Sequence, residues 1–383
     1  MKRAGSIFGA GLVFRLIVVS YLAHIKPSLL SWGVNEAGGL ARWIVTNHSF
    51  SSPFHDAHGP SAWLGPAYPL IVAAVFLVFG VQTQASALAM MVFNSVCSAV
   101  AGVVVCEIGN EVYGRKAGLF SGWIWALSSP IAILCFILWD TSLSALAFGE
   151  ALLLTLRLCS GKFKNWGVCG AIWGFAALVN PALIVPLPIL AFLLSERGKR
   201  WRSVFIMTLA TAVVIMPWTI RNYIVFDKFL LVRSNGLAEV YFANCGFQSH
   251  PLGRSMEYQR LGEAAFTEQA NARAVECVGN HPTRFLRDSL HRAMLFWIYP
   301  INFWPITAGI DLAALVGLVE LFRKSRALAM PLLAVLLAYP LIYYASQVVS
   351  RYRHPIEPVL YVLSGIALSK ISKKTQPSSR REE

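Results

Sequence analysis

The run SALAMMVFNSVCSAVAGVVVC, residues 86–106, decides the fold class because it contains no charged side chain. A helix needs about 20 consecutive apolar residues to cross the hydrocarbon core of a bilayer. Similar runs recur from Ser6 to Ile371, and 56% of the 383 residues are hydrophobic whereas only 14% are charged. The sequence therefore predicts an all-α protein that crosses a membrane several times.

Ten apolar runs are predicted as crossings: residues 6–25, 86–106, 117–138, 142–158, 166–180, 181–194, 203–221, 302–322, 327–346 and 355–371. A further apolar stretch, 66–80, is short and contains Pro66 and Pro69 near its start. We predict that this stretch forms an interfacial helix at the outer membrane surface. The expected protein is one integral membrane domain, residues 1–383, with about ten transmembrane helices.

The charge distribution sets the expected orientation. The net charge is +14, and Lys and Arg gather in short connectors such as 115–116, 197–202, 323–326 and 370–381. Under the positive-inside rule these connectors are cytoplasmic. Both termini are then inside, and two long segments, 26–85 and 222–301, are external loops. No polar domain is present that could read a nucleic-acid groove, so nucleic acid is excluded as a partner.

The second external loop is predicted to contain a small helical cap. Residues 254–279 have helical patterning, His281-Pro282 interrupts it, and residues 283–297 resume it. Cys245 and Cys277 both lie in this loop. A disulfide between them would form in an oxidising compartment, and two free thiols are the alternative.

Four segments carry a resemblance to a known family: WGVNEAGGLARWIVTNHSFSSPF with GPSAWLGPAYPLIVAAVFLVFG, EVYGRKAGLFSGWIWALSSP with LWDTSLSALAF, NPALIVPLPILAFLL with PWTIRNYIVFDKFLLVRSNGLAEVYFAN, and HPTRFLRDSLHRAMLFW with RYRHPIEPVLYVLSGIAL. Together they resemble the GT-C glycosyltransferases, especially the family 39 type related to protein O-mannosyltransferases and aminoarabinose transferases. The resemblance implies interfacial helices in the first external loop. It also implies sugar transfer from a polyprenyl-phosphate donor to a lipid, glycan or protein acceptor outside the cytoplasm.

Glu36 is the candidate catalytic base. Inverting transfer needs a base for the acceptor hydroxyl and positive charge for the phosphate leaving group. The resemblance implies a catalytic acid in the first external loop, often within an Asp-Glu pair, but here the pair reads Asn35-Glu36. The alternative for Glu36 is a solvated or helix-terminal glutamate.

Asp140 is a second candidate catalytic carboxylate. It is predicted to lie on the same side of the membrane as Glu36. The resemblance implies that an acid at this place lines the active cavity, and that its counterpart in oligosaccharyltransferases helps to hold a metal. A helix N-cap at Thr141 is the alternative role. No metal site is assigned, although a divalent cation stays open as a cofactor.

The cluster Arg351, Arg353 and His354 is predicted to bind the donor phosphate. It is the one basic cluster on the external side, at the start of a helix. Arg221 is a weaker candidate for the same role. The alternatives are binding of lipid headgroups and pairing with Glu357.

Other polar residues are assigned structural roles. His55, Asp56 and His58 favour a loop turn over a metal site. Arg15, Glu150 and Asp311 fall inside predicted spans, where we expect buried ion pairs.

Two other functions compete with the enzyme: a lipid or sugar flippase, and a silent scaffold for envelope polysaccharide assembly. A bacterial inner membrane is the expected location, with the active site facing the periplasm.

Overall fold

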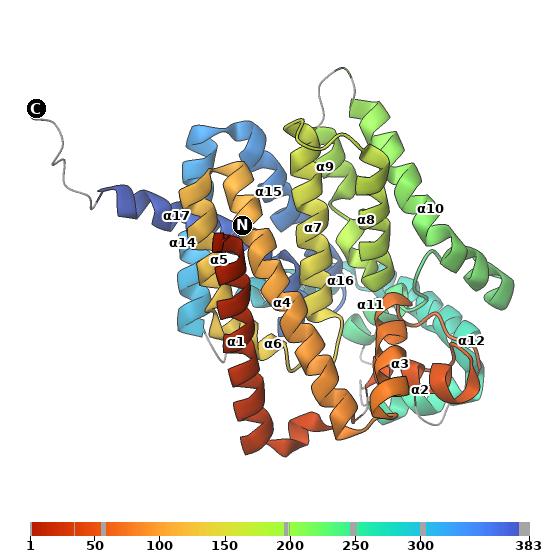
Figure 1. Ribbon diagram of the computed structural model, residues 1–383. Helices are drawn as coiled ribbons and strands as arrows, with labels where there is room; N and C mark the ends of the chain where they lie inside the picture. Colours follow the sequence, from red (N-terminus) through yellow and green to blue (C-terminus); the bar gives the residue numbers. More distant parts are fainter. Residues whose placement is uncertain are drawn as a thin grey trace, which may run out of the picture.

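The computed structural model describes residues 2–33, 35–54, 59–194, 198, 200–245, 251–298 and 304–374. Within these residues the regular structure is helical, apart from an isolated antiparallel bridge between Ser51 and Pro60. Long helices stand side by side in one bundle, and further helices gather at one of its ends (Figure 1). The predicted all-α fold is confirmed.

Among the described residues, six helices are long and apolar enough to cross a membrane. They are α1 (Lys2–Ile25), α4 (Gln84–Val112), α7 (Thr141–Cys159), α10 (Arg200–Phe226), α14 (Trp304–Lys324) and α15 (Arg326–Ala338) continued by α16 (Leu341–Ala345). The other predicted crossings coincide with α5 (Arg115–Ala126), α6 (Ser129–Leu134), α8 (Trp166–Val179), α9 (Leu187–Leu194) and α17 (Glu357–Lys374). The protein is therefore polytopic, and the number of about ten crossings stays a prediction.

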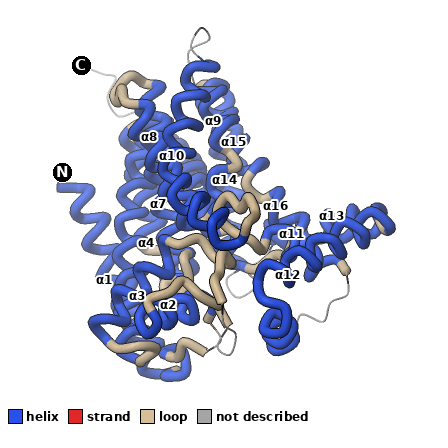
Figure 2. Tube along the Cα trace, turned by 90° about the vertical axis from the view of Figure 1, so that its right-hand side faces the viewer, coloured by secondary structure: helices blue, strands red, loops and turns tan. Residues whose placement is uncertain are grey.

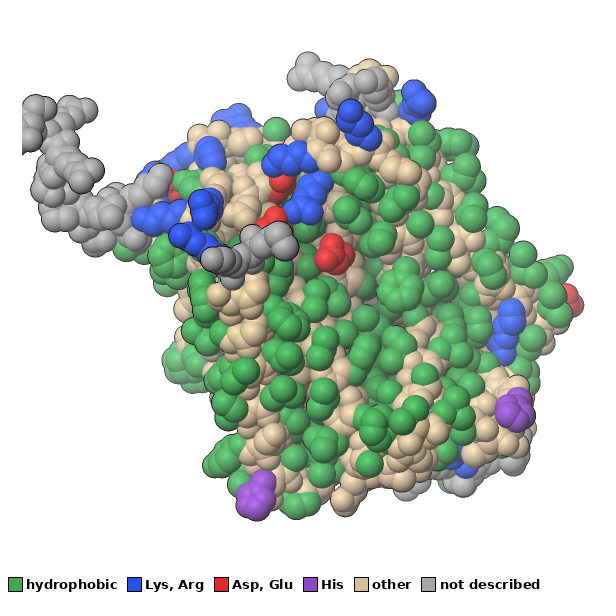
Figure 3. Space-filling view, in the orientation of Figure 1, with side chains coloured by type: hydrophobic (Ala, Val, Ile, Leu, Met, Phe, Trp, Pro, Cys, Tyr) green, Lys and Arg blue, Asp and Glu red, His purple; other side chains and the backbone are tan. Residues whose placement is uncertain are grey.

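The two ends of the bundle differ chemically. Lys and Arg side chains gather at one end (Figure 3), which we call the basic end. Lys162 bonds Glu111 there, and Arg323 and Lys370 both bond Glu320. The opposite end, which we call the loop end, carries helices α2 (Glu36–Asn47), α3 (Ala67–Phe79), α11 (Gly236–Asn244) and α12 (Pro251–Asn280). Helix α13 (Pro282–Ile298) follows α12 and projects sideways from the bundle (Figure 2).

Helices α12 and α13 lie in the segment that the sequence predicts as a helical cap, and their role as a cap stays a prediction. The break between α12 and α13 lies at His281, where the sequence predicted it. Cys245, directly after α11, forms a disulfide with Cys277 in α12. The placement of α3 at a membrane surface and the limits of the two external loops stay predictions.

Glycines allow close helix packing inside the bundle. A Cβ at Gly317 in α14 would collide with the backbone carbonyl of Leu363 in α17, and one at Gly170 in α8 with that of Met207 in α10. Small residues permit this approach between helices in a membrane. Because α17 packs closely against α14, the segment just before α17, which contains Arg351, Arg353 and His354, also has a defined position.

The ion pairs expected inside the spans are only partly found. Asp311 accepts a bond from Arg353 Nη1 at 2.9 Å, as expected. The expectation is wrong for Arg15, which donates instead to Ser98 and to the carbonyls of Trp125 and Ala126. Since α5 ends at Ala126, carbonyls of its last turn have no full set of helical donors, and Arg15 donates to two of them. Glu150 has no ion-pair partner within 4.0 Å in the described part of the chain.

Candidate active site

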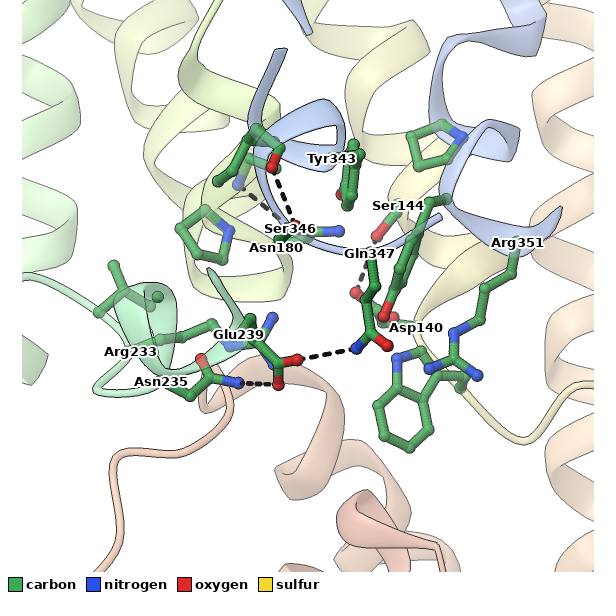
Figure 4. A pocket seen from close by; sticks show the side chains of 18 of the residues that line it. Asp140, Ser144, Asn180, Arg233, Asn235, Glu239, Tyr343, Ser346, Gln347 and Arg351 are labelled. Atoms are coloured by element: carbon green, nitrogen blue, oxygen red, sulfur yellow. Dashed lines mark hydrogen bonds between the residues drawn. The ribbon is translucent and has the colours of Figure 1, made fainter. Parts of the chain in front are cut away.

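A cavity of about 550 Å³ opens at the loop end of the bundle. Its charged lining consists of three carboxylates and two guanidinium groups: Glu36, Asp140, Glu239, Arg233 and Arg351. Figure 4 shows Asp140 and Arg351 on one side of the cavity, Arg233 and Glu239 on the other, and Gln347 between them. The cavity thus brings together two predicted catalytic acids with one predicted phosphate-binding residue.

Glu36 is the first residue of α2 and lines the cavity. Burial raises the pKa of its carboxyl above the usual range, and the negative charge of Glu239 raises it further. The positive charge of Arg233 opposes this shift. A carboxylate with a raised pKa is a stronger base than a solvated glutamate.

Asn35 fixes the start of α2 in a way that an ionised acid could not. Its side-chain oxygen accepts from the Gly38 amide at 2.7 Å, which caps the helix. Its Nδ2 donates to the carbonyl oxygen of Leu138 at 2.8 Å. An ionised carboxylate has no proton for the second bond. Asn35 therefore joins the segment bearing Glu36 to the segment bearing Asp140.

Asp140 occupies the N-cap position of α7, but its side chain makes no capping bond. The carboxylate accepts a bond from Ser144 Oγ at 3.1 Å and lines the cavity. Burial raises the pKa of this carboxyl, against the charges of Arg233 and Arg351. Asp140 therefore has the N-cap position without the capping bond of the alternative role, and its carboxylate lines the cavity.

Arg351 places an available guanidinium in the cavity. Its charged group lies 4.5 Å from the ring centre of Trp139 and 5.2 Å from that of Tyr352. Within the described residues, its buried Nε has no hydrogen-bond partner. A cation held by aromatic faces keeps its donors for a ligand.

Arg353 and His354 lie in the bundle and do not line the cavity. Arg353 is 3% exposed and bonds Asp311, and it also donates to the carbonyl of Trp297 at 3.1 Å. His354 is fully buried, with Nδ1 2.6 Å from Glu357 and its ring stacked on Trp125. The alternative of pairing with Glu357 is therefore the arrangement observed. Their role in binding phosphate gains no support from it.

Arg221 also points elsewhere. It donates to the carbonyls of Ser61 at 2.7 Å and Phe50 at 3.1 Å, and its guanidinium lies 4.8 Å from the Trp218 ring centre. These bonds attach the first-loop segment to α10. Arg221 positions this segment and does not line the cavity.

Arg233 and Glu239 line the cavity, although the sequence analysis did not select them. Arg233 donates through Nε to the Trp63 carbonyl at 3.0 Å. Glu239 accepts bonds from Asn235 Nδ2 at 3.2 Å and Gln347 Nε2 at 2.7 Å. Both lie in VRSNGLAEV, residues 232–240, near the start of the second predicted external loop and on the predicted side of Glu36. This position was a signal that could have identified them.

A junction beside the cavity holds the two loop-end segments together. Glu263 is 4% exposed and accepts from the Ala62 amide at 2.6 Å, Ser234 Oγ at 2.7 Å and Tyr258 Oη at 2.6 Å. Burial raises the pKa of its carboxyl. The junction anchors the loop that carries Arg233, and so helps to position this guanidinium.

The described residues contain no group of three or more His, Cys, Asp or Glu side chains arranged to hold a metal ion. The hypothesis of a divalent cation therefore gains no support from the geometry. His55, Asp56 and His58 lie outside the described residues.

Comparison with known proteins points to one fold. Residues 60–221 match the family described as dolichyl-phosphate-mannose-protein mannosyltransferase. No protein of curated function matches the sequence.

Solved structures extend the likeness to almost the whole chain. The oligosaccharyltransferase AglB from Archaeoglobus fulgidus, in complex with an inhibitory peptide and a dolichol-phosphate, is 13% identical, with a TM-score of 0.60 over 99% of this chain and 52% of that one. The same enzyme tethered to an acceptor peptide is 16% identical, with a TM-score of 0.57 over 94% and 50%. ArnT from Cupriavidus metallidurans bound to undecaprenyl phosphate is 14% identical, with a TM-score of 0.54 over 94% and 61%.

These similarities show the GT-C fold and confirm the resemblance inferred from the sequence. The chain spans about half the length of the oligosaccharyltransferase.

Proposed function

We propose that this protein transfers a sugar from a polyprenyl-phosphate donor to an extracytoplasmic acceptor, with inversion at the anomeric carbon. One observation carries the proposal. The carboxylates of Glu36 and Asp140 and the available guanidinium of Arg351 line the same cavity at the loop end. This set supplies the base and the phosphate-binding cation that the reaction requires.

The difference in charge between the two ends of the bundle supports the side of the membrane on which we place the reaction. Lys and Arg gather at the end opposite the cavity (Figure 3), and such residues mark the cytoplasmic side of membrane proteins. The cavity then opens to the exterior, which is the periplasm for a bacterial inner membrane. We place the acceptor there.

In the proposed reaction, Glu36 takes the proton of an acceptor hydroxyl. The hydroxyl oxygen forms a bond to the anomeric carbon from the face opposite the phosphate. The bond between the anomeric carbon and the phosphate oxygen breaks, and the electron pair leaves with the lipid phosphate. Asp140 lies near enough to Arg233 and Arg351 for their charges to lower its pKa against the effect of burial. We propose that its carboxylate holds the acceptor or serves as a second base.

Arg351 stabilises the charge that develops on the departing phosphate. Guanidinium groups bind phosphate oxygens with paired hydrogen bonds. Arg233, across the cavity, is the second cation for this role (Figure 4). The lipid ligands of two solved structures, dolichol-phosphate in AglB and undecaprenyl phosphate in ArnT, support a donor of this class.

Glu239 is proposed to contact the transferred sugar. Two amides, from Asn235 and Gln347, fix its carboxylate at the cavity wall. The carboxylate offers hydrogen-bond acceptors and the neighbouring amides offer acceptors and donors, which suits the hydroxyl groups of a sugar ring.

Asn35 bears on the competing scaffold function. Its replacement of an acid could indicate a silent protein. However, its amide makes two bonds that hold Glu36 beside the Asp140 segment. This positioning role favours the enzyme.

Product formation by purified, reconstituted protein tests the proposal. Radiolabelled polyprenyl-phosphate sugars are offered with envelope extract as acceptor, and wild type is compared with Glu36→Gln. Transfer or slow donor hydrolysis by wild type, lost in the variant, is the expected result. Equal activity of both proteins would exclude Glu36 as the base, and silence of both with every donor would favour the scaffold or flippase.

A further inference from the structure

Helix α13 presents an apolar stripe to its surroundings. Leu286, Leu290, Met294 and Ile298 are 60%, 64%, 49% and 63% exposed. Their spacing of four residues places them on one face of the helix. Phe296, on the other side of the helix, is buried at 1% exposure. The helix is therefore packed on one face and has an exposed apolar stripe on the other.

Basic residues border this stripe. Arg284, Arg287 and His291 are all exposed. Asp288 is the one acid in α13, and it lies 3.1 Å from Arg287 and 3.6 Å from Arg284. The helix contains three arginines against this single acid, so its net charge is positive.

The position of α13 limits what can cover the stripe. The helix ends at Ile298, and α14, which is apolar enough to cross a membrane, begins at Trp304. Six residue steps extend over at most about 20 Å, so the end of α13 lies close to the start of a membrane crossing. Figure 2 shows α13 running sideways from the bundle, across the direction of the long helices. This is the orientation of a helix that lies along a membrane.

We propose that α13 is an interfacial helix bound to the outer leaflet of the membrane. The apolar stripe inserts among acyl chains, and Arg284 and Arg287 contact the phosphate groups of anionic phospholipids. An apolar face bordered by basic residues is the pattern of helices that lie in a membrane interface. A second copy of the chain is a less favourable partner, because the basic residues that border the two apolar stripes would repel each other.

The inner face of α13 joins this membrane contact to the wall of the cavity. Arg292 donates to the Tyr344 carbonyl at 2.8 Å and to Asn244 Oδ1 at 2.6 Å. Trp297 Nε1 donates to Tyr344 Oη at 2.7 Å. Tyr344 belongs to α16, and the cavity residues Ser346 and Gln347 follow directly. The bound helix therefore sets the height of this wall above the membrane, independently of the chemistry proposed for the cavity.

Spin-label accessibility in the full-length protein tests this proposal. A nitroxide is attached to Leu290→Cys on the stripe, or to Glu276→Cys on α12 as a control at another exposed position. Cys159, the one partly exposed free cysteine among those described, is replaced by Ser in both. Each protein is placed in nanodiscs of phosphatidylglycerol or of phosphatidylcholine, and collisions with oxygen and with a water-soluble nickel chelate are measured.

We expect collisions with oxygen, which partitions into lipid, to dominate for a nitroxide at position 290. Collisions with the water-soluble nickel chelate should dominate at position 276. Each arginine near an anionic surface strengthens binding about fivefold, equivalent to about 1 kcal/mol. Arg284→Gln with Arg287→Gln should therefore reduce lipid contact at position 290 in phosphatidylglycerol and have little effect in phosphatidylcholine.

Nickel-dominated collisions at position 290 in both lipids would overturn the proposal. Shielding from both reagents together with spin–spin broadening would assign the stripe to a second copy of the chain instead. Lipid contact unchanged by the double substitution would contradict the role of the arginines.

Discussion

Arg351 and Arg353 are two residues apart and belong to opposite environments. Arg353 lies in a buried ion cluster, which we define as Asp311, Arg353, His354 and Glu357, and its charge is balanced there. Arg351 lies in the cavity beside the rings of Trp139 and Tyr352, and it has no ion-pair partner within 4.0 Å among the described residues. A cation paired within the fold supports packing, whereas a cation without a built-in partner can bind a ligand.

Carboxylates show the same contrast. Burial raises the pKa values of Glu263, Glu36 and Asp140 alike. Glu263 accepts three hydrogen bonds from within the protein, whereas among the described residues Ser144 is the one side-chain donor to Asp140. A raised pKa alone therefore does not identify a catalytic group, because structural carboxylates also have one. The number of hydrogen-bond donors that the protein itself supplies distinguishes the structural carboxylate Glu263 from the candidate catalytic carboxylate Asp140.

The largest effect is expected from Glu36→Gln. The amide keeps the shape but cannot accept the acceptor's proton, so transfer should fall about 100- to 10,000-fold. Initial rates of transfer from the donor that wild type uses provide the measurement. Its control is Glu239→Gln, which should change the apparent affinity for the donor more than the maximal rate. A larger loss of maximal rate in the control would reverse the two assignments.

Arg351→Gln should lower the transfer rate about 100- to 1,000-fold, as removal of a group that stabilises developing negative charge does. Since the side chain has aromatic contacts and no ion pair within the described part of the chain, the unfolding temperature should stay near that of wild type. Rate and unfolding temperature are measured on the same preparation. A fall in both the transfer rate and the unfolding temperature would assign Arg351 a structural role like that of Arg353.

Arg353→Gln tests the other side of the contrast. Removing one partner of a buried ion pair costs about 3–5 kcal/mol, because the remaining charge is left without compensation. The unfolding temperature should be lower than that of wild type, whereas the transfer rate per folded molecule should be normal. Arg353→Lys, which keeps the charge, should recover part of the stability. A stable but inactive Arg353→Gln protein would return this residue to the catalytic site.

Glu263→Ala should cost about 1–3 kcal/mol, because the buried donors of Ala62, Ser234 and Tyr258 lose their acceptor. Activity should fall only moderately, through looser positioning of Arg233. Denaturation in detergent gives the stability, and the transfer rate at saturating donor gives the activity. A loss of activity as large as that of Glu36→Gln, at unchanged stability, would give Glu263 a chemical role.

The smallest expected effect is on the pH profile. Glu36 must be ionised to act as a base, and burial raises its pKa. The rate should therefore fall with decreasing pH through a midpoint above the 4.5 of an ordinary glutamate. Removing the positive charge in Arg233→Gln should move this midpoint to higher pH, because Arg233 favours the ionised form. A shift to lower pH would contradict the proposed placement of these charges.

Much of the fold could be predicted from the sequence. Apolar runs identified the long helices, and Pro282 marked the break in the cap because proline removes a helical donor. The number of crossings was harder to predict, since the predicted span 117–138 is divided near Pro130 into the two short helices α5 and α6. Cys245 and Cys277 were placed in one loop by the sequence, but only the packing of α12 brings them together.

The site could be predicted only in part. Glu36 and Asp140 were chosen through the family resemblance and their side of the membrane, and Arg351 as part of the one external basic cluster; all three line the cavity. The sequence RYRH does not show that Arg351 faces the cavity and Arg353 faces Asp311, because that depends on the packing of α17 against α14. Arg233 was missed for a similar reason, since the Glu263 junction that positions its loop joins residues about 200 positions apart, Ala62 and Glu263.

Binding of undecaprenyl phosphate tests the contrast between the two arginines most directly. Dissociation constants are measured for purified wild type, Arg351→Gln and Arg353→Lys in nanodiscs of the same lipid. We expect the Arg351 variant to lose most of its affinity and Arg353→Lys to bind like wild type. Equal affinity of wild type and Arg351→Gln, with weaker binding by Arg353→Lys, would contradict the assignment of the cavity as the donor-phosphate site.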